Sequence, residues 1–269
     1  MRILIADSDG AYRPAAGVID HFAAGLARRL SARPPVRVQW PQPEEARLRR
    51  PRTWDAAAAA GVADLARIVR LHPSDELILL GSRCGCRVIQ DWLAACPDQL
   101  DRVVAVGLLA DPCRPRDAEL RGAGAPDGHG VAGERVGPVP DRTFWVSVPG
   151  DPLSDVEPDG LLRTAVDHSP LTPDQVYRGL LADLPDSRTR LAARLHVLEH
   201  PTRWPAVFGP RLDRAREQLV RYGDDGSLGR YTEAGPGGRS PLELLADRIA
   251  HEVRARRAAG TVERGALAS

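Results

Sequence analysis

The stretch DELILLGSRCGCRVIQDWL, residues 75–93, decides the fold of this chain. Its first part, Glu76–Leu80, is a short apolar run of the kind that forms a fully buried strand. From Cys86 to Ala95 the apolar residues instead recur at helical spacing. Only a turn bounded by Gly81 and Gly85 separates the two patterns. A buried strand that leads directly into a helix predicts one unit of a parallel α/β sheet.

The turn itself has the spacing of a nucleophile elbow, a strained strand-to-helix turn. Small residues are needed at its two ends, here Gly81 and Gly85, because a Cβ atom would clash there. The central side chain is then expected to project above the sheet, at the N-terminus of the helix. In serine hydrolases this residue is Ser, and here it is Arg83.

The rest of the first half repeats the alternation of strand and helix signals. Helical faces are expected within residues 18–30 and 56–71, and further strands at Arg2–Ala6, Val36–Trp40, Arg102–Leu109 and Thr143–Val148. Parallel neighbours need crossover connections, which the helical segments supply. The sequence therefore predicts an α/β fold: a three-layer sandwich with a mainly parallel central sheet.

The second half has a different pattern, without an obvious strand. Short helices are expected at Gly160–Asp167, Asp174–Leu184, Ser187–Glu199 and Pro210–Tyr222. We interpret residues 155–222 as a helical insertion or lid. Ser240 and Pro241 then have the pattern of a helix start. We expect one domain over residues 1–255, and a frayed tail from Arg254, with residues 256–269 outside the domain.

Composition narrows the class of protein. Apolar residues make up 43% and charged residues 27%, and the net charge is +1, which is typical of a globular protein and argues against a nucleic-acid surface. All 37 basic residues are Arg, and neither Lys nor Asn occurs, which is typical of a GC-rich genome. No apolar run is long enough for a membrane span, and Ile3–Ala6 is too short for a signal peptide. We expect a chain that is cytoplasmic at synthesis.

The cysteines, Cys84, Cys86, Cys96 and Cys113, form no zinc-binding pattern with one another or with His. We expect free thiols, no metal and no cofactor.

Several segments together resemble one family, the cutinase-type α/β-hydrolases and above all the phage lysin B esterases. Besides the elbow, residues 108–115 (LLADPCRP) resemble the family's Gly-Asp-Pro-Met-Arg segment, and Gly128–Val131 resembles its Gly-x-Gly-Ile loop. Residues 144–155 resemble the strand that ends in the catalytic Asp, which the resemblance places at Asp151. Members of this family cleave mycolic acid esters in mycobacterial envelopes, which implies a phage or a high-GC actinobacterial host.

The departures from the family bear directly on activity. The family's Ser falls on Arg83, and residues 226–230 contain no His where the family has one before the Tyr that matches Tyr231. Asp7 and Asp9 fall near the oxyanion-binding turn, where their charge would repel an oxyanion. Asp151 alone of the triad is retained, as a vestigial acid. The acyl-enzyme route is then closed.

Two alternatives stay open at this point. Cys84 is an alternative nucleophile in a shifted register, its thiol pKa expected to be lowered by the helix N-terminus and by Arg83 and Arg87. Ser82 is a weaker candidate, and His129 is the substitute base best placed to face the pocket. Alternatively, Arg83 and the helix start at Gly85 hold an anion, with Asp7, Asp9 and His129 nearby.

The expected function is therefore a lysin-B-like protein that has lost esterase activity and serves as a binding or structural module. Its partners would be components of a virion or tail, or of a cell envelope. The alternative is an active ester hydrolase on envelope lipids that uses Cys84. We also expect an ion pair between Arg83 and Asp151, across the place where nucleophile and acid would face each other.

Overall fold

The computed structural model describes residues 1–7, 17–40, 53–124, 126–135, 137–182, 195, 208–224, 228–235 and 237–267. Its centre is a five-stranded sheet in the order β2-β1-β3-β4-β5, and every pairing in it is parallel. The strands are β1 (Arg2–Asp7), β2 (Val36–Arg37), β3 (Leu77–Ser82), β4 (Val103–Leu109) and β5 (Thr143–Val146). The three central strands are buried along their whole length, which explains why they read as continuous apolar runs.

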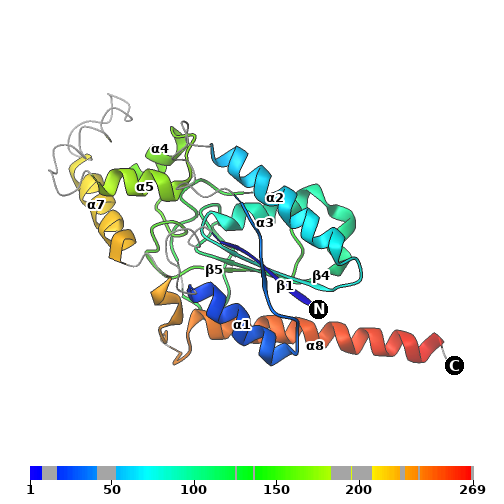
Figure 1. Ribbon diagram of the computed structural model, residues 1–269. Coiled ribbons are helices and arrows are strands. Elements are labelled where there is room, and N and C mark those ends of the chain that lie inside the picture. Colours follow the sequence, from blue (N-terminus) through cyan, green and yellow to red (C-terminus); the bar gives the residue numbers. More distant parts are fainter. Residues whose placement is uncertain are drawn as a thin grey trace.

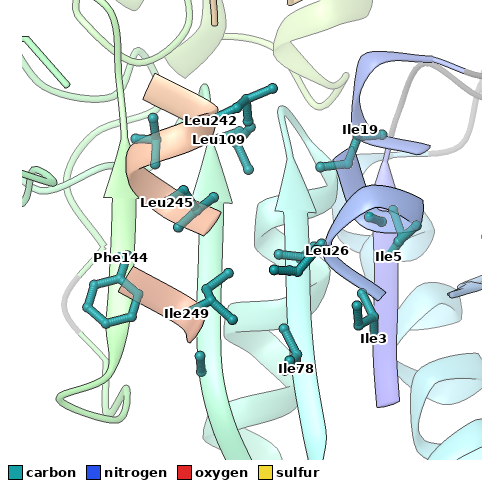
Figure 2. Packing of buried hydrophobic residues seen from close by; sticks show 14 of the residues in the cluster. Ile3, Ile5, Ile19, Leu26, Ile78, Leu109, Phe144, Leu242, Leu245 and Ile249 are labelled. Atoms are coloured by element: carbon teal, nitrogen blue, oxygen red, sulfur yellow. The ribbon is translucent and has the colours of Figure 1, made fainter. Parts of the chain in front are cut away.

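Helices cover both faces of the sheet, so the predicted three-layer α/β-hydrolase-type architecture is confirmed (Figure 1). One face carries α1 (Val18–Leu30) and α8 (Pro241–Leu267), and the other carries α2 (Trp54–Leu71) and α3 (Gly85–Ala95). Figure 2 shows Leu26 of α1 and Leu245 of α8 lying over the strands on the first face. A second apolar cluster fills the space between the sheet and α2 and α3. The short 3-10 helices are η3 (Pro97–Arg102) and η5 (Gly229–Thr232).

The segment between β5 and η5 contains helices α4 (Leu161–Asp167), α5 (Pro173–Leu181) and α7 (Phe208–Asp224), in the region where the sequence predicts an insertion. They share an apolar cluster of their own, which includes Leu162, Tyr177 and Leu219. They lie beyond the carboxyl ends of the strands, which is the edge that the elbow faces (Figure 1). The helix expected at Ser187–Glu199 falls outside the described residues, apart from Leu195.

Several expected element boundaries differ from the structure, among them those of β2 and α8. Strand β2 ends at Arg37 rather than at Trp40, although the Val38 amide still donates to the Ile5 carbonyl at 2.8 Å. Helix α8 continues to Leu267, so the expectation of a frayed tail from Arg254 is wrong for the residues described. An ion pair between Arg256 and Glu76, 2.9 Å from Nε to Oε1, attaches this part of α8 to the body of the protein.

Among the described residues, no helix combines the length and the apolar character that crossing a bilayer requires.

Candidate functional site

Arg83 occupies the centre of the turn between β3 and α3, and its backbone has the left-handed φ of +51°. Non-glycine residues rarely adopt this conformation, and such strain is found at functional turns. A Cβ atom on Gly85 would lie 2.2 Å from the Ala6 carbonyl oxygen, and one on Gly81 would lie 2.8 Å from the Cys86 Cα. Both glycines are therefore required by close backbone approach. The predicted elbow geometry is confirmed, with Arg83 at its centre.

The Arg83 side chain is buried beneath the helical insertion. Its Nη1 atom lies 3.6 Å from Oδ1 of Asp174, the second residue of α5, and both side chains are about 5% exposed or less. Its guanidinium carbon lies 5.4 Å from the ring centroid of Tyr222 in α7, a cation–π arrangement. Two helices of the insertion thus contribute the surroundings of the residue at the elbow.

Asp174 is the polar centre of this contact. Its Oδ1 accepts a hydrogen bond from the Tyr222 hydroxyl at 2.6 Å, and its Oδ2 accepts one from the Cys84 thiol at 3.1 Å. Sequence reasoning missed Asp174, because its position after Thr172 and Pro173 indicates only the start of a helix. Nothing in that local pattern indicates a contact with a turn far away in the chain.

Cys84 has the environment of a structural thiol. The residue is fully buried, and burial raises its thiol pKa well above the ordinary value, with the neighbouring Asp174 carboxylate adding to the shift. Arg83 acts in the opposite direction but is the smaller influence. The expectation of a lowered thiol pKa at Cys84 is therefore wrong, because burial outweighs the effect of Arg83. All four cysteines have free thiols, as expected.

Asp151 lies in the turn that follows β5, and its carboxylate is occupied by its own surroundings. Oδ1 accepts hydrogen bonds from the Leu153 and Ser154 amides at 2.9 and 2.8 Å and from the Ser154 hydroxyl at 3.0 Å. Oδ2 accepts a hydrogen bond from the Tyr231 hydroxyl at 2.9 Å. The expected ion pair with Arg83 is wrong for the residues described, since Arg83 pairs with Asp174 and these four donors satisfy Asp151.

Arg83 and Asp151 nevertheless line the same small pocket, with Tyr222, Leu228 and Tyr231 among the other lining residues. Its volume is about 20 Å³. That is enough for about one water molecule.

Neither Asp7 nor His129 lines this pocket. Asp7, at the end of β1, accepts a hydrogen bond from the Ser82 hydroxyl and pairs with Arg37 at 3.2 Å. Asp9 lies outside the described residues. His129 forms an antiparallel bridge with Val156, and its Nε2 lies 4.0 Å from a carboxylate oxygen of Glu134.

Burial and nearby arginines lower the pKa of His129, so the neutral imidazole is favoured near pH 7. His129 is not a lining residue of the Arg83 pocket. Within the described part of the chain, no group of His, Cys, Asp and Glu side chains has the arrangement of a metal site.

No protein-family model matches the sequence, and no curated protein matches it. Among solved structures, lysin B from Mycobacteriophage D29 is similar over 92% of this chain and 98% of its own, with 14% identity and a TM-score of 0.51. The catalytic core of an acetyl xylan esterase from Trichoderma reesei is 13% identical over 62% of this chain and 91% of its own, at a TM-score of 0.42. A cutinase-like protein from Cryptococcus sp. is 17% identical over 58% of this chain and 79% of its own, at a TM-score of 0.37.

At these identities the similarity concerns the fold alone. The parallel sheet, the elbow and the likeness to lysin B together define the class: an esterase-like α/β-hydrolase fold.

Proposed function

We propose that this protein is a non-catalytic member of the α/β-hydrolase fold class and serves as a binding or structural module. The observation that carries the proposal is the position of Arg83: at the centre of the elbow, buried, and paired with Asp174. A guanidinium has five N–H donors, no acceptor lone pair, and a pKa too high for deprotonation in a protein. It cannot attack an ester carbonyl, so no acyl-enzyme can form at this position.

The surroundings of Asp151 support the same proposal. In a catalytic triad the acid orients an imidazole and stabilises its charged form. Here Oδ2 of Asp151 accepts a hydrogen bond from the Tyr231 hydroxyl, and burial raises the pKa of the phenol well above its ordinary value. A phenol held in its protonated form donates a hydrogen bond but does not accept a proton from a nucleophile.

The packing of the insertion is a third observation that supports the proposal. A pocket of about 20 Å³ next to Arg83 is far smaller than the several hundred Å³ of a typical ligand pocket. Among the described residues, Asp174 and Tyr222 occupy space next to Arg83 that an ester at the elbow would need. An anion at Arg83 would likewise compete with a carboxylate already in place.

For the partner, we infer a component of a virion or tail, or of a bacterial cell envelope. The support is the resemblance to the lysin B family and the fold shared with the mycobacteriophage protein. An envelope partner predicts that the protein sediments with purified mycobacterial cell walls without releasing mycolic acid. A virion partner predicts instead that it is found in purified particles.

Turnover of p-nitrophenyl butyrate tests the loss of activity. The wild-type protein is expected to show only the background rate. Two variants test the alternative nucleophile: Cys84→Ala, and Cys96→Ala near the end of α3 as the matched control. Hydrolysis that Cys84→Ala abolishes and Cys96→Ala retains would overturn the proposal and identify a cysteine esterase.

A further inference from the structure

A second cavity, partly open to solvent at the exposed Pro138, lies between α3, the edge strand β5 and the connection between β4 and β5. Its volume is about 240 Å³, and none of its lining residues lines the Arg83 pocket. The lining is mainly apolar and includes Pro115, Pro138, Val139 and Trp145. An apolar cavity of about 150 Å³ suffices to hold a benzene molecule. The cavity therefore has room for a ring with a substituent.

Gln90 supplies an uncharged polar group in the lining of the cavity. Its side chain is buried, and its Nε2 donates a hydrogen bond to Oδ2 of Asp111 at 2.5 Å. Trp145 Nε1 donates to the same oxygen at 3.0 Å, and the Cys113 amide donates to Oδ1 at 2.9 Å. Since Asp111 accepts these bonds, the amide nitrogen of Gln90 faces Asp111. The amide oxygen, Oε1, is thereby directed away from that carboxylate.

The Gln90 Oε1 atom is buried and has no hydrogen-bond partner among the described residues. A buried acceptor without a partner is costly, and native proteins rarely contain one without a reason such as a bound molecule. Gln90 is also a lining residue of the cavity. A ligand that brings an N–H or O–H donor to Oε1 would satisfy the acceptor.

The charges around the cavity favour a neutral ligand. Arg135, the cation in the lining, already pairs with Asp91, which also lies 3.4 Å from Arg87. Behind Gln90 lies Asp111, which is fully buried, and burial raises its pKa to about 6. At neutral pH the Asp111 carboxylate would thus repel an anionic ligand in the cavity, whereas it would not repel a neutral donor.

We propose that this cavity binds a small neutral ligand of the phenol class, with its ring among Pro138, Val139 and Trp145 and its hydroxyl donating to Gln90 Oε1. The proposal does not depend on the loss of esterase activity. It would hold equally for an active enzyme, because the cavity and the elbow pocket share no residue.

Isothermal titration of the full chain with phenol and with toluene tests the proposal. Toluene has nearly the same shape and lacks the donor. We expect phenol to bind the wild-type protein more tightly than toluene, and Gln90→Met to lower the ratio of the two affinities roughly tenfold, which is the size of one hydrogen bond. Val139→Trp, which fills the cavity, should abolish the binding of both compounds.

Three results would overturn the proposal. If the ratio of phenol affinity to toluene affinity is the same in the wild type and in Gln90→Met, the ligand hydroxyl does not bind the amide oxygen. Binding that persists in Val139→Trp would show that the ligand binds outside the cavity. No binding of phenol to the wild type would show that the cavity does not take ligands of the phenol class. Near-UV circular dichroism checks the fold of each variant, and Val139→Trp keeps the test decisive if Gln90→Met does not fold.

Discussion

Arg83, at the carboxyl edge of the sheet, is paired with Asp174 of the helical insertion across a distance of 3.6 Å. The two residues are 91 positions apart in the chain, and both are buried. The same carboxylate accepts hydrogen bonds from Tyr222 and Cys84. This one side chain therefore connects the elbow, α5 and α7, in the place where a hydrolase would leave room for a substrate.

Removing Asp174 should destabilise the fold strongly. Asp174→Ala leaves Arg83 buried without this carboxylate and deprives Tyr222 of its acceptor, and breaking a buried pair costs about 3–5 kcal/mol. Urea unfolding measures the loss. The control is Glu157→Ala in the same insertion, because its ion pair with Arg214 is about half exposed on both sides, at 50% and 49%, and an exposed pair contributes about 1 kcal/mol or less. Equal losses in the two variants would contradict the buried role of Asp174.

The hydroxyl of Tyr231 should contribute to stability through Asp151. Tyr231→Phe keeps the ring and removes the donor to Oδ2, so we expect a loss of about 1–3 kcal/mol in the free energy of unfolding. Leu71→Ala, at a side chain 63% exposed, serves as a control that should change little. A Tyr231→Phe protein as stable as the wild type would mean that this hydrogen bond is absent in solution.

Asp111 should make stability fall as the pH rises. Its pKa is raised from 3.8 to about 6 in the folded protein, so between these values the folded state binds the proton more tightly than the unfolded state. The contribution of Asp111 is thus greatest below about pH 4 and is lost as the pH rises through about 6, by about 3 kcal/mol at ~1.4 kcal/mol per pKa unit.

Denaturation of the wild type and of Asp111→Asn between pH 4 and pH 7 isolates the contribution of Asp111 to the free energy of unfolding, since the other carboxylates titrate in both proteins. The difference in unfolding free energy between the two proteins should change with pH in this window. A difference that stays constant would show that the Asp111 pKa is not raised.

Restoring a triad should need more than a serine. Arg83→Ser alone is expected to give little esterase activity, because no base takes the hydroxyl proton. Leu228 lines the pocket with a left-handed φ of +59°, a conformation that His tolerates better than most residues.

We expect Arg83→Ser with Leu228→His to exceed either single change, since triad residues act as a unit, and Tyr231→Phe to increase the rate further by freeing Asp151. p-Nitrophenyl butyrate turnover is the measurement. Ordinary esterase rates from Arg83→Ser alone would mean that another residue already acts as the base.

The architecture and the elbow were predictable from sequence because both depend on local patterns. Buried parallel strands read as apolar runs, and a strand, two glycines and a helix in sequence define the turn at Arg83. The pairing of Arg83 was not predictable, because it depends on how the insertion folds back over the sheet. The sequence predicts a pair between Asp151 and Arg83 because both follow strands at the carboxyl edge of the sheet. The Asp151 carboxylate instead accepts hydrogen bonds from its own turn and from Tyr231, which satisfy it without an ion pair.

Intact-mass spectrometry can show whether an acyl-enzyme forms at the elbow. The wild-type protein is mixed with excess p-nitrophenyl butyrate and quenched in acid during the reaction. Its intact mass is measured, and a digest then locates any adduct. The expected result is the unmodified mass, because Arg83 cannot attack the ester and Cys84 is a buried thiol with a raised pKa. A butyryl adduct that maps to residues 82–86 would contradict it.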